Sequence, residues 1–203
     1  MIRLIAITDS LRDGPRGLAL RAAAAVEGGA TMIQLRLKEE SARSLVELAR
    51  VIRAAAPGVP LVVNDRADVA LAAGAAGVHV GVDDLSPAVL RRFVPPGFII
   101  GASVGDDDEV GRAAGADYVG IGPVFATGSK SDAGTAIGPA RFAELARRCG
   151  LPAVAIGGIS AETAPDVVAA GASGIAVISA LFGAPDPTRA ALDLRAALDA
   201  SGS

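Results

Sequence analysis

Residues 61–80 contain one full repeat of the pattern that decides the fold, LVVNDRADVALAAGAAGVHV. The apolar run 61–64 is typical of a buried strand, and an Ala-rich helical segment follows it at 69–73. The small-residue stretch 73–77 predicts a corner, because glycine after the last turn of a helix turns the chain back toward the next strand. A second apolar run follows at 77–80. The stretch therefore predicts a strand, a covering helix and a parallel return.

The same pattern recurs along the whole chain. Short apolar runs occupy residues 2–7, 31–36, 61–64, 77–80, 98–102, 118–121, 153–156 and 174–177. Helix-like segments lie between or after them at 17–27, 42–55, 69–73, 87–93, 109–114, 139–148, 163–170 and 187–199. Eight units share 203 residues, about 25 each. This predicts an α/β fold, a single-domain (β/α)8 TIM barrel over residues 1–200 with 201–203 as a frayed tail. An open doubly wound sheet is the alternative, but its usual five or six strands would leave units over.

Composition narrows the function classes. Hydrophobic residues make up 51% of the chain and charged residues 20%, so a large core is expected rather than disorder. The net charge of -3 argues against a nucleic-acid partner. The single cysteine, Cys149, excludes an intrachain disulfide. No apolar run approaches a membrane span and the start does not resemble a signal peptide, so no membrane partner and a cytoplasmic location are expected.

Polar residues cluster where the predicted strands end, which in this fold is where active sites lie. Alternation places Gln34, Arg36 and Lys38 on one side of an extended segment. Two cations and an amide suit a polyphosphate, although a solvated loop would also carry such charges. Asn64 and Asp65 end the third strand and offer oxygen ligands, although both residue types are also favoured as helix N-caps.

The fourth strand ends before a second acidic pair, Asp83 and Asp84. Carboxylates from neighbouring strands, completed by water and substrate oxygens, are the usual ligands of Mg²⁺. His79, the only histidine, lies within that strand. Its residue type allows proton transfer, and a hydrogen-bonded structural role is the alternative.

The later strand ends offer hydroxyls and backbone amides. Ser103 lacks a base triad, so an anion contact is expected rather than a nucleophile. The long loop 122–138 has the features of a lid and includes Lys130. Amides near Gly158 and at residues 178–179 predict a monophosphate site. A polyphosphate site beside a monophosphate site favours transfer between two phosphorylated small molecules over isomerisation or aldol chemistry.

Several motifs then resemble one family along nearly the whole chain. They are QLRLK at 34–38, NDRADVAL at 64–71, GVHVG at 77–81 with Asp83 and Asp84, GIGPVF at 120–125, KSDA at 130–133 and AIGGI at 155–159. Their order and spacing are similar to those of the thiamine-phosphate synthases. The resemblance implies a Mg-assisted transferase that joins hydroxymethylpyrimidine pyrophosphate to hydroxyethylthiazole phosphate. Pyrophosphate leaves first to give a carbocation, and thiamine phosphate is the product.

The resemblance also implies residue roles. It assigns the pyrimidine pyrophosphate to Gln34, Arg36, Lys38, Asn64, Ser103 and Lys130, the last two being catalytic. It assigns Mg²⁺ to Asp65 and Asp84, and the thiazole phosphate to Thr127, Ser129, Gly158, Ile178 and Ser179.

Three positions depart from the family pattern. Ser129 stands where relatives often have Thr, Val82 where they often have Gln, and Gly105 where many have His. The related thiazole tautomerases are one alternative, but their proton-transfer histidine is expected near Gly105. A non-catalytic phosphate-binding barrel is the other. The sequence leaves the oligomeric state open, with a homo-oligomer as one alternative.

Overall fold

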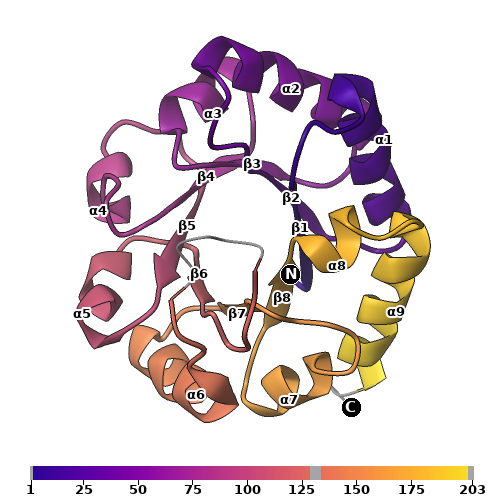
Figure 1. Ribbon diagram of the computed structural model, residues 1–203. Helices are drawn as coiled ribbons and strands as arrows, with labels where there is room; N and C mark the ends of the chain where they lie inside the picture. The colour runs from indigo at the N-terminus through magenta and orange to yellow at the C-terminus, as the bar shows by residue number, and fades with distance from the viewer. Residues whose placement is uncertain (1, 129–133, 201–203) are drawn as a thin grey trace.

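The computed structural model describes residues 2–128 and 134–200, and its eight parallel strands close into a barrel (Figure 1). The barrel closes because β8 pairs with β1, with Ala6 opposite Val177. The strands are β1 (Leu4–Ile7), β2 (Met32–Leu35), β3 (Leu61–Asn64), β4 (Gly77–Val80), β5 (Ile99–Val104), β6 (Tyr118–Ile121), β7 (Ala153–Ile156) and β8 (Gly174–Val177). The predicted (β/α)8 barrel is confirmed, and the open sheet is excluded.

Helices surround the barrel as its outer layer (Figure 1). They are α1 (Gly14–Glu27), α2 (Ala42–Ala55), α3 (Ala67–Ala73), α4 (Pro87–Leu90), α5 (Asp107–Val110), the 3₁₀ turn η1 (Gly111–Ala113), α6 (Gly138–Cys149), α7 (Ala164–Ala169), α8 (Ser179–Phe182) and α9 (Pro187–Ala200). Three predicted helices differ from expectation by being shorter or divided: α4 ends at Leu90, the segment 109–114 divides between α5 and η1, and α7 lacks one predicted residue at each end. The one-turn helix α8 was not predicted.

Strand alternation divides the apolar residues into two cores. Ile5, Ile7 and Met32 belong to a cluster inside the barrel, whereas Leu4 and Ala6 pack into the layer between strands and helices. A side chain two residues beyond an inward one points to the same side. Inward positions near each strand's carboxyl end therefore face the barrel mouth.

The predicted corners are formed as glycine caps. Gly74 ends α3 in the left-handed conformation, with φ of 63°, and its N–H bonds to the carbonyls of Ala70 and Leu71. A residue with a Cβ would be strained there, which explains the glycine. At the other end of a helix, Ser41 caps α2 by accepting a hydrogen bond from the Ser44 N–H.

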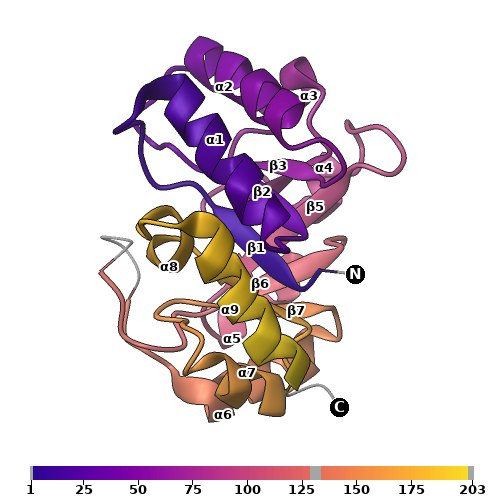
Figure 2. The ribbon, with the colours of Figure 1, turned by 90° about the vertical axis from the view of Figure 1, so that its right-hand side faces the viewer.

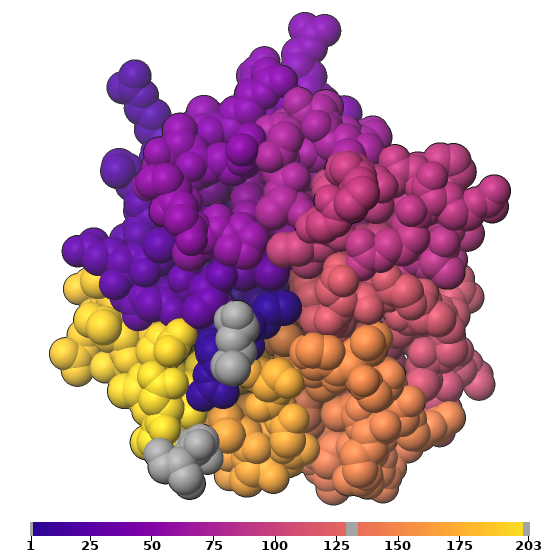
Figure 3. All heavy atoms as spheres, turned by 180° about the vertical axis from the view of Figure 1, so that it is seen from behind, coloured from indigo at the N-terminus to yellow at the C-terminus, as the bar shows by residue number. Residues whose placement is uncertain are grey.

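The two ends of the barrel differ. α8 lies at one end, and the first residues of β1 and the last of α9 lie toward the other (Figure 2). Side chains fill the face seen from behind, and the beginning of the chain crosses its middle (Figure 3). Within 2–128 and 134–200, no helix is long and apolar enough to cross a membrane. The expected cytoplasmic location stays a prediction.

Candidate active site at the carboxyl ends of the strands

One cavity of about 530 Å³ opens at the carboxyl ends of the strands. Residues that follow β2 to β8 line it, so distant parts of the chain meet there. Ten of the predicted site residues are on its wall: Arg36, Lys38, Asn64, Asp65, Asp84, Ser103, Thr127, Gly158, Ile178 and Ser179. The strand-end clustering predicted from the sequence is therefore present in the structure.

Three of the predicted site residues are not on the described wall of the cavity. Gln34 is 4% exposed and does not belong to the described wall of the cavity. Its side chain instead hydrogen bonds with Tyr118 inside the barrel. Ser129 and Lys130 lie outside the described residues, so the predictions for them stay predictions.

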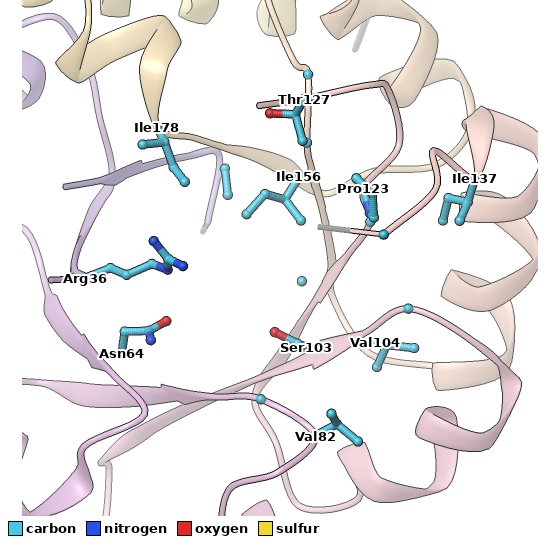
Figure 4. A pocket seen from close by; sticks show the side chains of 18 of the residues that line it. Arg36, Asn64, Val82, Ser103, Val104, Pro123, Thr127, Ile137, Ile156 and Ile178 are labelled. Atoms are coloured by element: carbon cyan, nitrogen blue, oxygen red, sulfur yellow. The ribbon is translucent and has the colours of Figure 1, made fainter. Parts of the chain in front are cut away.

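The basic side of the cavity is built on β2. Inward alternation runs from Met32 through Gln34 to Arg36. Figure 4 shows the Arg36 side chain extending into the cavity, with Asn64 beside it and the Ser103 hydroxyl facing them from the other side. Lys38 also lines the cavity. A planar guanidinium beside an ammonium suits an anion with several oxygens.

Two carboxylates face this basic side. Burial, followed by the charge and hydrogen bond of Asp84, raises the pKa of Asp65 to about 6, although Lys38 and Arg36 act in the opposite direction. Asp84 is fixed because one of its oxygens accepts a hydrogen bond from the Gly81 N–H at 2.8 Å. Two carboxylates within hydrogen-bonding distance of each other repel when both are ionised. A cation placed between them would relieve that repulsion.

The backbone of Asp65 is itself unusual. Its φ is 62°, the one positive value at a non-glycine residue in the described chain. The conformation is held by a 2.7 Å hydrogen bond from the Asp65 N–H to the His79 carbonyl. Asp and Asn tolerate this region better than most residues, and strained backbone often occurs at functional sites. The turn aims the Asp65 carboxylate toward Asp84 rather than leaving it as a helix cap.

The donor set suits a hard divalent cation that keeps open positions. In the described residues, no cluster of three or more His, Cys, Asp or Glu side chains could hold a metal alone. Asp65 and Asp84 would supply two oxygens, and water or a substrate would supply the others, which is how Mg²⁺ is commonly held. The neighbouring Asp83 is exposed, so the preference for Asp84 fits the geometry.

A buried hydrogen-bonded chain lies beneath the cavity. The two ring nitrogens of His79 lie 3.0 Å from the Tyr118 hydroxyl and 3.1 Å from Ser103 Oγ. Burial raises the pKa of Tyr118, so its phenol stays protonated at neutral pH. A Cβ at Gly101 would come within 2.4 Å of the His79 ring, so the glycine gives the ring its space. The geometry is that of the hydrogen-bonded alternative for His79, and proton transfer by it stays untested.

Backbone around Gly158, Ile178 and Ser179 forms another part of the cavity wall. Gly158 has a φ of 64°, and a Cβ there would meet the Ala126 carbonyl oxygen at 2.6 Å. The loop after β7 therefore packs directly on the loop after β6. Ser179 begins α8, with Ile178 as its N-cap, so their N–H groups lie at the first turn of a helix. Thr127 and Ile178 border the same part of the cavity (Figure 4).

The predicted lid loop has a closed stem. The Ile137 N–H bonds to the Pro123 carbonyl at 2.9 Å, and the Gly138 N–H bonds to the Val124 carbonyl at 2.9 Å. The loop thus leaves and returns at one place on the cavity wall.

The sequence did not single out Tyr118 or Glu109. Tyr118 is the only tyrosine and lies in a buried strand, which could have marked it. Glu109 lines the cavity and accepts a hydrogen bond from the Gly105 N–H at 2.6 Å. Its place on a short helix gave no comparable signal.

Comparison with known proteins gives one result. The family model for thiamine monophosphate synthase matches residues 4–181. The thiamine-phosphate synthase of Azorhizobium caulinodans is 48% identical over 98% of this chain and 96% of its own. That of Methanoculleus marisnigri is 50% identical over 95% and 93%. The solved thiamine phosphate pyrophosphorylase from Pyrococcus furiosus superimposes with a TM-score of 0.88 at 37% identity, covering 98% of this chain and 96% of that one.

Proposed function

Since the chain belongs to the thiamine monophosphate synthase family, whose curated relatives are transferases that form thiamine phosphate, we propose how this site performs the reaction. The substrates are hydroxymethylpyrimidine pyrophosphate and hydroxyethylthiazole phosphate. The C–O bond to pyrophosphate breaks, and pyrophosphate leaves with the electron pair. The thiazole nitrogen then donates its electron pair to the resulting pyrimidinylmethyl cation, which gives thiamine phosphate.

One observation carries the proposal. One cavity is lined by cations and a pair of carboxylates and, on another part of its wall, by the backbone around Gly158 and Ile178. Two anchored phosphate groups would bring the thiazole nitrogen to the electrophilic carbon, and such positioning supplies much of the acceleration in a two-substrate reaction.

The basic side would hold the leaving group. Arg36 and Lys38 bind the pyrophosphate oxygens, and their positive charges stabilise the negative charge that grows there as the C–O bond breaks. Asn64 and Ser103 face the same space and would orient the pyrimidine end. We expect Lys130 to act with Ser103 on this substrate and Gln34 to contribute from the layer below.

Asp65 and Asp84 would hold Mg²⁺, which when bound supplies positive charge to the leaving pyrophosphate. The raised pKa of Asp65 supports this assignment, because burial and then the neighbouring Asp84 both disfavour the ionised carboxylate that a bound cation would stabilise.

The amide side would hold the thiazole phosphate. N–H groups near Gly158, Ile178 and Ser179 can point at one anion, and hydroxyls of Thr127 and Ser129 would complete its contacts. Only glycine fits at Gly158, because a Cβ would collide with the adjacent loop. The loop after β7 is therefore closely packed against the loop after β6 at this place.

The carbocation needs protection from water. Ile156, Ile178 and Pro123 border the space between the two anion sites (Figure 4). Apolar side chains there would offer no hydrogen bond to a water that could capture the cation, and closure of the loop 122–138 would shield it further.

The test mixes purified protein with both substrates and Mg²⁺ and measures thiamine phosphate by chromatography, with EDTA in a parallel reaction. We expect product only without EDTA. An Arg36→Ala variant should lose most turnover, whereas the control Arg50→Ala on the exposed side of α2 should keep it. Failure of the wild-type chain to form product with Mg²⁺ would contradict the proposal.

The same reaction separates the two alternatives. A tautomerase would isomerise a thiazole phosphate without using the pyrimidine substrate, and Gly105 provides no side chain for that proton transfer. A binding protein would retain both phosphorylated compounds without product.

A further inference from the structure

The side chain of Thr8 joins β1 to the backbone of Arg36. Thr8 is fully buried and comes one residue after the end of β1. Its hydroxyl accepts a hydrogen bond from the Arg36 N–H at 2.8 Å and lies 3.1 Å from the Arg36 carbonyl oxygen, to which it donates. One hydroxyl thus contacts both backbone polar groups of Arg36.

These bonds lie where β2 leaves the sheet. The Thr8 N–H bonds to the Gln34 carbonyl at 3.0 Å, which continues the ladder between β1 and β2 past Ile7. In a regular parallel ladder the next bond would run from the Arg36 N–H to the Thr8 carbonyl. The Thr8 hydroxyl accepts that bond instead, so a side chain fixes the residue that follows β2.

Arg36 is the point at which such a brace matters. Its guanidinium extends into the cavity, and Leu37 and Lys38 continue into the loop beyond it. A bidentate contact needs the Arg36 backbone to be held closely, because a small shift at Cα moves the whole planar group.

We propose that Thr8 is a positioning residue that holds the Arg36 backbone so that its guanidinium meets the pyrophosphate group of the substrate. The inference rests on the proposed function, since Arg36 must be a pyrophosphate ligand. Thr8 does not touch the substrate and acts through Arg36. β1 is the one strand whose carboxyl end contributes no residue to the described wall of the cavity, and Thr8 lies at that end.

The chain provides a matched control at the other end of the same strand pair. The Thr31 hydroxyl accepts hydrogen bonds from the N–H groups of Arg3 at 3.0 Å and Leu4 at 3.1 Å, and it lies 3.2 Å from the Leu4 carbonyl oxygen. Thr31 therefore bridges β1 and β2 with similar bonds, but away from the cavity. Its loss should affect the strand pair without reaching Arg36.

The experiment titrates Mg²⁺-saturated inorganic pyrophosphate into the full chain by calorimetry and records thermal unfolding of each protein. The variants are Thr8→Val, Thr8→Ser, Thr31→Val and Arg36→Ala. Steady-state KM values for both substrates are measured beside them. Thr8→Val keeps the shape and removes the hydroxyl, and Thr8→Ser keeps the hydroxyl.

We expect Thr8→Val to weaken pyrophosphate binding by about 5- to 30-fold, the effect of one or two lost hydrogen bonds at a buried group. KM for the pyrimidine substrate should rise and KM for the thiazole phosphate should not. Thr8→Ser should bind within about threefold of wild type, because the hydrogen bonds remain. Thr31→Val should unfold at a lower temperature but bind pyrophosphate normally.

Three results would overturn the inference: wild-type affinity in Thr8→Val, equal loss in Thr8→Val and Thr31→Val, or weak binding by a folded Thr8→Ser. The last result applies even if Thr8→Val does not fold. Failure of the proposed function would be visible separately, because wild type would then not bind pyrophosphate, or Arg36→Ala would bind it normally. Either outcome removes the role of Arg36 and overturns the inference as well.

Discussion

The carboxylates of Asp65 and Asp84 lie within hydrogen-bonding distance of each other, although they follow different strands. Asp65 reaches this position through a backbone φ of 62°. Its pKa is raised to about 6, first by burial and then by Asp84. Below about pH 6 and without a cation, Asp65 therefore keeps its proton, and a bound divalent cation would take the place of that proton.

Substitution of either carboxylate should weaken Mg²⁺-dependent pyrophosphate binding. Asp65→Asn and Asp84→Asn should each cost about 10- to 100-fold in affinity, the usual effect of removing one charged partner. Asparagine is the better replacement for Asp65, since it tolerates the left-handed backbone that would strain alanine. Calorimetric titration with and without Mg²⁺ measures the effect.

Asp83→Asn is the matched control. Its side chain is exposed beside Asp84, so it should change the affinity by less than about twofold, as expected for a screened surface charge. Normal Mg²⁺ dependence in both Asp65→Asn and Asp84→Asn would remove the pair from the metal site.

The raised pKa of Asp65 predicts a pH-dependent stability in metal-free buffer. Between the usual value of 3.8 and the folded value of about 6, the folded protein retains a proton that the unfolded chain has released. The free energy of unfolding should therefore receive its full contribution below about pH 4 and lose it as the pH rises through about 6. Urea unfolding at several pH values measures it, and Asp65→Asn should remove this part of the slope. Parallel curves for variant and wild type would contradict the pKa assignment.

The fold could be predicted because its sequence pattern repeats along the chain. Each strand run is followed by an amphipathic segment and a glycine corner such as Gly74, and the structure has a strand at all eight places. The one-turn α8 was missed because residues 179–182 are too few to show a helical period. Local signals mark elements of several turns and not single turns held by tertiary contacts.

The site could be predicted only as a set of strand-end residues. The barrel rule placed Arg36, Asn64 and Ser103 correctly at one mouth. It did not separate the cavity wall from the layer beneath, where Gln34 contacts Tyr118. Thr8 was not singled out because its effect depends on strand register, which pairs β1 with β2 and is not visible from β1 alone.

The buried contact between Tyr118 and His79 predicts a stability effect. Tyr118→Phe leaves the ring in place and removes the hydroxyl that lies 3.0 Å from His79 Nδ1. Because the site is buried, the variant should unfold with about 1–3 kcal/mol less free energy, the cost of an unsatisfied buried polar group. Denaturant unfolding measures it. A double variant with His79→Ala should show less than the sum of the single losses, and full additivity would mean that the two side chains are not coupled.

Gly158 joins the loops that border the amide side. Its φ is 64°, and an added Cβ would meet Ala126 O at 2.6 Å and Phe125 Cβ at 2.7 Å. Gly150 provides a close comparison, because its φ is 63° but a Cβ there would have no heavy atom within 4 Å. The two positions therefore share the backbone strain and differ in the collision.

This pair of glycines separates backbone strain from loss of the phosphate site. Gly150→Ala and Gly158→Ala should each lose about 1 kcal/mol of stability because alanine is strained in the left-handed region. Gly158→Ala alone must also displace the loop after β6, so its KM for the thiazole phosphate should rise by at least about tenfold, the equivalent of 1.4 kcal/mol in binding. Its affinity for pyrophosphate should fall less than its affinity for the thiazole phosphate, since Arg36 and Lys38 follow β2 and are not part of the displaced loop. Steady-state kinetics on the thiazole substrate and calorimetry on pyrophosphate measure the two effects. Equal KM values in the two variants would show that the packing of Gly158 against the loop does not support the phosphate site.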